Sequence, residues 1–262
     1  MGLTDAQRHQ AAEALRTAEA TQVAIAPLLR SYPGIDVVDA YEIQLLNIRR
    51  RLAAGATVHG HKVGLSSKAM QEMMGVDEPD YGHLLSDMVY TEESPIPTRS
   101  FLIPRVEVEV GFVLGDDLPG EGCTVADVLR CTDYIAPAIE LIDSRIADWK
   151  IGLMDTIADN ASSCGVILGK ERVKPDELDV KAIEATLDIN GTRVAAGRSD
   201  AVLGDPTIAV AWLANKVASF GVRLEAGHVV LPGSCTRAYD VKPGDDVVAT
   251  FSGLGSVHLT FA

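Results

Sequence analysis

Apolar residues repeat at helical spacing near the N-terminus of the chain. Thr4 or Asp5 can cap a first helix, which runs through alanine-rich sequence towards Pro27. A second helix is predicted to begin near Asp39, and Gly55 offers its stop signal. The apolar positions of this second helix follow spacings of four, three and four, so they share one face. They are Tyr41, Leu45, Ile48 and Leu52.

From residue 58 onward the pattern changes to short β-like runs broken by Gly, Pro and Asp. One amphipathic helix, residues 207–220, interrupts them; Asp205 and Pro206 introduce it and Gly221 closes it. The predicted strands are residues 58–65, 106–114, 135–142, 166–168, 185–189, 229–231, 247–251 and 257–261.

Strands dominate this pattern, and helices do not alternate with them regularly. That order disfavours a doubly wound parallel sheet and favours an α+β fold, in which mixed strands roll around a central cavity. The composition shifts near Ala54, so we expect two parts: a helical N-terminal cap over residues 1–54 and a β-roll domain over residues 55–262.

The composition and net charge of the chain argue against some classes of binding partner. The 262 residues are 47% hydrophobic, enough for a full core, and the net charge of −14 argues against nucleic acid or an anionic membrane as a partner. No apolar run approaches the roughly 18 residues that a membrane span needs, and the N-terminus lacks the pattern of a signal peptide. A cytoplasmic protein is expected, with its four cysteines as reduced thiols because none forms a C-x-x-C pair.

The segment from Arg105 to Val110 alternates strictly, so that Arg105, Glu107 and Glu109 share one strand face while the valines take the other. A solvent-exposed amphipathic strand is the ordinary interpretation of such a pattern. Two carboxylates on one face repel each other, however, unless a cation lies between them.

Glu140 lies in a second candidate strand among apolar neighbours, where an unpaired charge is costly. Glu107, Glu109 and Glu140 could therefore form an all-oxygen site that suits Mg²⁺ or Mn²⁺ better than Zn²⁺. The alternative is that Glu140 pairs with Arg145 or another basic residue.

Six segments, in this order along nearly the whole chain, resemble the hydratase/decarboxylase family of meta-cleavage pathways, part of the fumarylacetoacetate hydrolase superfamily. They are residues 60–65 (GHKVGL), 75–82 (GVDEPDYG), 104–109 (PRVEVE), 139–145 (IELIDSR), 158–163 (ADNASS) and 253–257 (GLGSV). The resemblance implies a mixed β-roll. Residues 144–151 and 231–237 are more similar to the hydratases than to the decarboxylases.

The resemblance implies a lyase of the hydro-lyase class, acting in catabolism of aromatic or steroid rings. It would hydrate 2-hydroxypenta-2,4-dienoate, through its 2-oxo tautomer, to 4-hydroxy-2-oxopentanoate. The first alternative is decarboxylation of 2-oxo-3-hexenedioate. Cleavage of a carbon–carbon bond in an acylpyruvate, and a non-catalytic metal-binding subunit of an aldolase or decarboxylase complex, are further alternatives.

Carried over position by position, the resemblance implies that Glu107, Glu109 and Glu140 bind the metal, and that Lys62 and Asp80 are catalytic. Asp80 follows Pro79 in a turn-like segment, where an isolated Asp more often caps a turn, and an isolated Lys62 would more often form a surface salt bridge. A homo-oligomer, as a ring of five or a pair of such rings, is also implied, as is association with a downstream aldolase. The residues expected to bind substrate are Ser162, Ser163 and Ser234.

Overall fold

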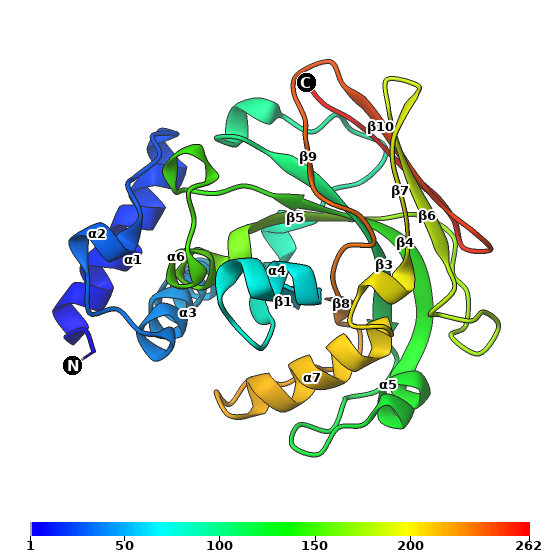
Figure 1. The fold of residues 1–262 in the computed structure, drawn as a ribbon, viewed down its shortest axis with the longest axis horizontal. Helices are drawn as coiled ribbons and strands as arrows, with labels where there is room; N and C mark the ends of the chain where they lie inside the picture. Colours follow the sequence, from blue (N-terminus) through cyan, green and yellow to red (C-terminus); the bar gives the residue numbers. More distant parts are fainter. Residues whose placement is uncertain (1) are drawn as a thin grey trace.

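The computed structural model of the chain, which describes residues 2–262, consists of an N-terminal group of helices beside two curled β-sheets. Figure 1 shows the helices in blue on one side and the sheets on the other, with α7 beneath the larger sheet. The architecture is the predicted α+β roll. The α-helices are α1 (Asp5–Thr21), α2 (Leu28–Ser31), α3 (Val37–Ala53), α4 (Lys68–Met74), α5 (Val125–Cys131), α6 (Leu153–Ala158) and α7 (Pro206–Ala218).

The larger sheet has the strand order β2-β1-β8-β3-β4-β5, with β9 paired to β3. All of its neighbours are antiparallel except β1 and β8, so the sheet is mixed. Its strands are β1 (Val58–Gly64), β2 (Asp80–Leu85), β3 (Arg105–Leu114), β4 (Thr132–Ile142), β5 (Ser163–Leu168), β8 (Val229–Leu231) and β9 (Tyr239–Asp240).

The smaller sheet has the order β11-β10-β6-β7 and is antiparallel throughout. Fully buried side chains from both sheets, such as Phe112 and Ile139 of the larger and Leu187 and Val247 of the smaller, belong to one continuous apolar core. Burying this core provides most of the driving force for the roll. The strands are β6 (Glu184–Ile189), β7 (Thr192–Arg198), β10 (Asp246–Phe251) and β11 (Gly255–Thr260).

The N-terminal helices pack on the hairpin formed by β1 and β2. The side-chain amide of Gln44, on α3, donates hydrogen bonds to the carbonyls of Tyr81 (3.0 Å) and Ile157 (2.8 Å). The ring of Tyr41 stacks on that of Tyr81, with centroids 4.7 Å apart. These contacts tie α3 to the hairpin and to α6; the division into a cap and a roll domain stays a prediction.

Several boundaries differ from the prediction. The first helix ends at Thr21, short of Pro27, because Gln22 adopts the left-handed conformation that ends a helix. The second begins at Val37, with Asp36 as its N-cap. The prediction missed β2, whose six residues are all buried, because its DYGH sequence resembles a turn. It also missed β7, whose Ala, Gly and Arg residues carry little strand signal.

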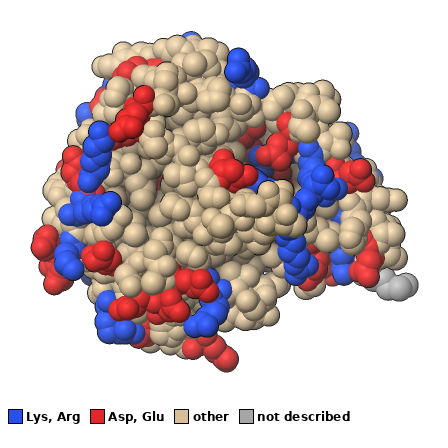
Figure 2. All heavy atoms as spheres, turned by 180° about the vertical axis from the view of Figure 1, so that it is seen from behind, with Lys and Arg blue, Asp and Glu red and all other residues tan. Residues whose placement is uncertain are grey.

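Within residues 2–262, no helix is both long and apolar enough to cross a membrane. Figure 2 shows acidic and basic side chains intermingled in small groups over the face seen from behind.

Candidate metal centre and active site

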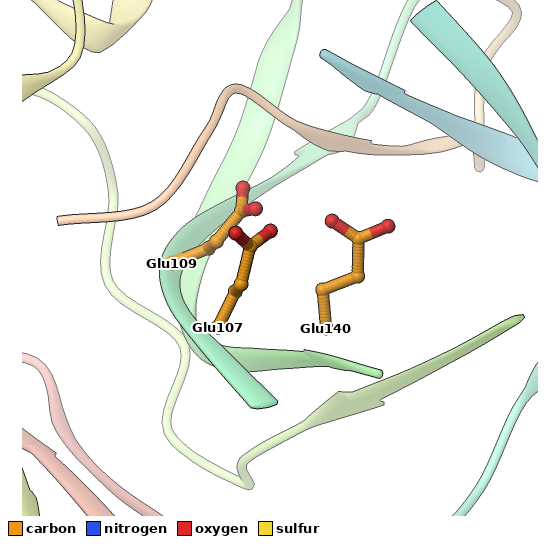
Figure 3. Close-up of side chains that lie close together, drawn as sticks. All are labelled: Glu107, Glu109 and Glu140. Atoms are coloured by element: carbon orange, nitrogen blue, oxygen red, sulfur yellow. The ribbon is translucent and has the colours of Figure 1, made fainter. Parts of the chain in front are cut away.

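Three glutamates converge on one face of the larger sheet. The alternation of β3 directs Glu107 and Glu109 to this face and packs Val106 and Val108 into the core on the other. Glu140, on β4, is the register partner of Glu107. One carboxylate oxygen from each glutamate lies within 4.8 Å of the other two, and Figure 3 shows the three side chains together. The structure thus brings together the three predicted metal ligands.

The surroundings make this cluster unfavourable without a cation. Glu109 and Glu140 are fully buried, and Glu107 is half-buried. Burial, and then the charges of neighbouring carboxylates, raise the pKa of Glu107 to about 7 despite the opposing effect of Lys62. The same two causes raise the pKa of Glu109 well above its usual value. Burial also raises the pKa of Glu140.

Several oxygens of the cluster have no hydrogen-bond partner among the described residues. They are Oε1 of Glu109 and both carboxylate oxygens of Glu140. Buried carboxylate oxygens without donors are rare and require an explanation. A hard divalent cation with oxygen ligands fits this donor set, and the absence of sulfur or imidazole donors disfavours Zn²⁺.

A loop after β8 fixes the position of Glu109. The backbone N–H of Gly233 donates to Oε2 of Glu109 at 2.7 Å. Gly233 has φ of +127°, and a Cβ there would lie 1.8 Å from Oγ of Ser66, so only glycine fits. The prediction missed this residue, although the Pro-Gly-Ser run after a strand marks a turn.

Ser234 holds the same loop on β3. Its hydroxyl accepts from the backbone N–H of Val108 at 3.1 Å and lies 3.2 Å from the carbonyl of that residue. These contacts use the Ser234 hydroxyl to fix the backbone beside Glu109. Binding of substrate by Ser234 stays a prediction.

Lys62 lies in the middle of β1, opposite Gly82 on β2. Its ammonium is 3.4 Å from Oε2 of Glu140 and donates to the carbonyl of Ala161 at 2.9 Å. Burial alone would lower its pKa, but the charges of Glu140 and the other carboxylates outweigh burial and raise that pKa above its usual value. The interpretation of Lys62 as part of a surface salt bridge is therefore wrong, because the side chain is buried.

Asp80 begins β2 directly opposite Gly64, so it lies in a strand and not in the expected turn. A Cβ on Gly64 would come within 2.2 Å of Oδ1 of Asp80 and 3.4 Å of Nζ of Lys62. The missing side chain at Gly64 therefore makes room for both charged groups. Neither oxygen of Asp80 has a hydrogen-bond partner among residues 2–262, and burial raises its pKa despite the proximity of Lys62.

A strained turn presents the carbonyl that receives the Lys62 hydrogen bond. Asn160, Ala161 and Ser162 have φ of +56°, +50° and +58°, a run that L-residues rarely adopt. The Asn160 side chain locks this turn to β2, because it accepts from the N–H of His83 at 2.8 Å and donates to its carbonyl at 2.9 Å. The prediction assigned no role to Asn160.

Ser162 and Ser163 follow in this turn and at the start of β5. Both are buried, and neither hydroxyl has a hydrogen-bond partner among the described residues. Buried hydroxyls without partners are available for a ligand or a water molecule. The free hydroxyls are consistent with the predicted role of Ser162 and Ser163 in binding substrate, which stays a prediction.

Arg145 does not pair with Glu140. Its Nε donates to Oδ1 of Asp159 at 2.5 Å, and its backbone N–H donates to Oδ2 of the same residue at 2.9 Å. The predicted alternative, a pair between Glu140 and Arg145, is thus wrong. The basic residue close to Glu140 is Lys62. The Arg145–Asp159 pair supports the base of the strained turn.

A groove of about 670 Å³ lies behind this turn, between α1, α3 and the segment of residues 158–164. None of the three glutamates lines it. The chemistry of the carboxylates, and not the size of a cavity, therefore identifies the candidate site.

Comparisons with known proteins identify the family to which the chain belongs. The family model described as fumarylacetoacetate (FAA) hydrolase C-terminal matches residues 52–262. The 2-oxo-hept-4-ene-1,7-dioate hydratase of Escherichia coli is 44% identical over 95% of this chain and 96% of the relative. The 2-keto-4-pentenoate hydratase of Paraburkholderia xenovorans is 42% identical over 99% and 96%, respectively.

A solved structure is also similar over its full length. It is the 4-oxalocrotonate decarboxylase from Pseudomonas putida G7, complexed with magnesium and adipate, with 35% identity, a TM-score of 0.95 and coverage of 99% of each chain. The family model and these relatives together show that the chain belongs to the fumarylacetoacetate hydrolase family, as its motifs predicted.

Proposed function

We propose that this chain is a metal-dependent hydro-lyase that adds water to 2-hydroxypenta-2,4-dienoate, through its 2-oxo tautomer, to give 4-hydroxy-2-oxopentanoate. The observation that carries the proposal is the convergence of three glutamates, two fully buried and one half-buried, with Lys62 beside them. Two hydratases at 42–44% identity over nearly the whole chain support hydration as the reaction, and the one at 42% is named for 2-keto-4-pentenoate. Catabolism of aromatic compounds by meta-cleavage is the setting that this chemistry fits.

The cation that we assign to Glu107, Glu109 and Glu140 is Mg²⁺, with Mn²⁺ as a second candidate. Three carboxylates leave about three positions of an octahedral ion for water or substrate. The bound ion would supply positive charge that stabilises the negative charge developing on the 2-oxygen of the substrate. A related decarboxylase complexed with magnesium supports this choice.

Lys62 would offset the excess negative charge of the site. Three ligand carboxylates carry more charge than one dication neutralises, and the substrate adds another carboxylate. The ammonium of Lys62 is held by the Ala161 carbonyl and Glu140, so it is oriented before substrate arrives. We assign to it the orientation of the substrate carboxylate.

Asp80 is our candidate for moving protons. As the dienol becomes the conjugated ketone, the 2-hydroxyl loses a proton and C5 gains one; water then adds at C4 through its oxygen and loses a proton, while C3 gains one. A carboxyl group can serve both as acid and as base when its pKa lies nearer to neutral pH. Asp80 fits because burial raises its pKa and its oxygens have no hydrogen-bond partner among the described residues.

Decarboxylation of 2-oxo-3-hexenedioate is the second candidate function. The solved decarboxylase, at a TM-score of 0.95, is the observation that favours it. A non-catalytic metal-binding subunit is less consistent with the site, because Lys62 and Asp80 accompany the glutamates. Homo-oligomerisation and association with an aldolase stay proposals that rest on the resemblance alone.

Turnover assays distinguish these functions. With Mg²⁺, the purified protein should remove the dienoate absorbance of 2-hydroxypenta-2,4-dienoate without releasing CO₂. Glu107→Gln should lower kcat/KM by roughly 100-fold or more, because a ligand charge is lost where the transition state needs it. Glu121→Gln, in an exposed loop, is the matched control and should leave the rate unchanged. Release of CO₂ from 2-oxo-3-hexenedioate, with no hydration of the dienoate, would instead establish the decarboxylase.

Asp80→Asn and Glu109→Gln separate proton transfer from metal binding. Asp80→Asn should lower kcat by about 10²–10⁴-fold, the usual contribution of a general acid or base. Its affinity for Mg²⁺, measured by calorimetry, should change little. Glu109→Gln should weaken Mg²⁺ binding itself. An Asp80→Asn enzyme that keeps wild-type kcat would remove Asp80 from the mechanism.

Mg²⁺ binding should strengthen as pH rises from 6 to 8. Metal binding needs deprotonated carboxylates, and Glu107 has a pKa of about 7 in the metal-free protein. Below that pKa, affinity should rise roughly tenfold per pH unit for each proton displaced. The pKa of Glu107 is about 7 in the folded, metal-free protein and about 4.5 in the unfolded chain, so between these pH values the folded state binds more protons. The free energy of unfolding of the metal-free protein should therefore fall as pH rises from 4.5 to 7. Calorimetric titrations that show a pH-independent affinity would contradict this assignment.

A further inference from the structure

Arg105 is a charged residue of the site face to which the hydration reaction assigns no role. It precedes Glu107 by two positions on β3, so its side chain leaves the strand on the same face. Exposure rises along this face: Glu109 is fully buried, Glu107 is half-buried and the Arg105 side chain is 31% exposed. The carboxylate cluster is therefore most accessible from the end where Arg105 lies.

Two contacts orient the guanidinium of Arg105. Its Nε donates to Oδ1 of Asp240, on the neighbouring strand β9, at 2.7 Å. Its Cζ lies 4.3 Å from the centroid of the Trp149 ring, which is a stacking contact. No other described residue accepts a hydrogen bond from Arg105, so the terminal nitrogens Nη1 and Nη2 keep free donors.

The local backbone holds Trp149 under this guanidinium. Asp148 and Trp149 have φ of +59° and +54°; Asp tolerates this left-handed conformation, but it is unfavourable for a bulky residue such as Trp149. The indole N–H donates to the carbonyl of Ile103 at 3.1 Å and fixes the ring. Backbone strain of this kind is concentrated at functional sites, which points to a role for the stacked pair beyond a rim salt bridge.

We propose that Arg105 is a specificity-determining residue that binds the far carboxylate of a dicarboxylic 2-oxo acid through its free terminal nitrogens. This inference rests on the proposed function, because the near end of the substrate is the 2-oxo acid group at the glutamate cluster. The site would thus take a dicarboxylate in addition to the shorter monocarboxylate.

The length of a six-carbon dicarboxylate matches the spacing of Arg105 and Glu107 along β3. Two residues of an antiparallel strand advance about 6.8 Å, which separates the backbone positions of Arg105 and Glu107. A six-carbon dicarboxylate, with bonds of about 1.5 Å in a zigzag, spans roughly 6–7 Å between its end carbons. One carboxylate at the cluster would therefore place the other near Arg105. A planar guanidinium whose Nη1 and Nη2 edge is free is the group best suited to bind it.

The charge at the site also favours binding of the far carboxylate by Arg105. A dicarboxylate brings a second negative charge into a region that already contains Asp80 and three glutamates, so its far end needs a cation. Lys62 contacts Glu140 and Ala161 and is assigned to the near carboxylate of the substrate, whereas the terminal nitrogens of Arg105 have no acceptor among the described residues. Asp240 occupies only the Nε edge of Arg105, and its own side chain is largely exposed.

Binding of two matched probes tests the proposal without turnover. Adipate and hexanoate have the same carbon chain and differ in one terminal carboxylate. Calorimetry with the Mg²⁺-loaded protein should give at least about tenfold tighter binding of adipate, the effect of a charge-assisted bidentate contact. Arg105→Gln should abolish this preference, and Arg105→Lys should retain part of it because the charge remains without the fork.

Arg193→Gln is the matched control, since Arg193 also forms an Arg–Asp pair through Nε at 2.7 Å, but on β7 of the other sheet. It should keep the wild-type preference for adipate. Equal binding of adipate and hexanoate by the wild type, or a preference that survives Arg105→Gln, would overturn the proposal.

Turnover then separates this inference from the proposed function. The ratio of kcat/KM for 2-oxo-hept-4-ene-1,7-dioate to that for 2-hydroxypenta-2,4-dienoate should fall at least about tenfold in Arg105→Gln, mainly through KM. An unchanged ratio would count against Arg105. If wild type hydrates neither compound yet prefers adipate in an Arg105-dependent way, the hydratase assignment fails and the carboxylate-binding role of Arg105 stands.

Discussion

The mutual repulsion of three converging carboxylates, two of them fully buried, is the constraint on which the rest of this structure depends. Glu107 and Glu140 are paired across two antiparallel strands, and Glu109 follows on the same face. Strand pairing fixes the backbone, so the three side chains leave the sheet close together on one face. The repulsion must be offset by protonation, which the raised pKa values of the glutamates favour, or by positive charge, which Lys62 supplies in part and a divalent cation can supply more fully.

Glycines around the cluster help to accommodate the three carboxylates, as do the charged residues. Gly64 leaves room for Asp80 and Lys62, and Gly233 brings a backbone N–H within 2.7 Å of Glu109. The strained turn at residues 160–162 presents a carbonyl to Lys62. On the α3 side, Gln44 and Tyr41 pack on the β1–β2 hairpin that carries Lys62 and Asp80.

Much of this arrangement could be predicted from local sequence. The alternation around Glu107 and Glu109 predicted their common face, and the apolar neighbours of Glu140 predicted its burial. Family resemblance, and not spacing, singled out Lys62 and Asp80, because a single lysine or aspartate carries no signal of its own. The pairing of β1 with β2, which brings them together, depends on contacts between segments that the local pattern does not encode.

The parts that could not be predicted are those set by tertiary packing. Asp80 looked like a turn residue because Pro79 precedes it and Gly82 follows, yet burial of the whole segment makes it a strand. Gly233 and Asn160 act through backbone and amide contacts with residues far along the chain. Only a three-dimensional structure shows that Arg105, on the same face as the glutamates, lies on the ring of Trp149.

Crystallography of the protein with Mn²⁺, using anomalous scattering to locate the ion, tests the central claim most directly. One strong anomalous peak is expected about 2.0–2.2 Å from an oxygen of each of Glu107, Glu109 and Glu140. A well-ordered site with no peak among these carboxylates, or an ion bound elsewhere in the chain, would contradict it.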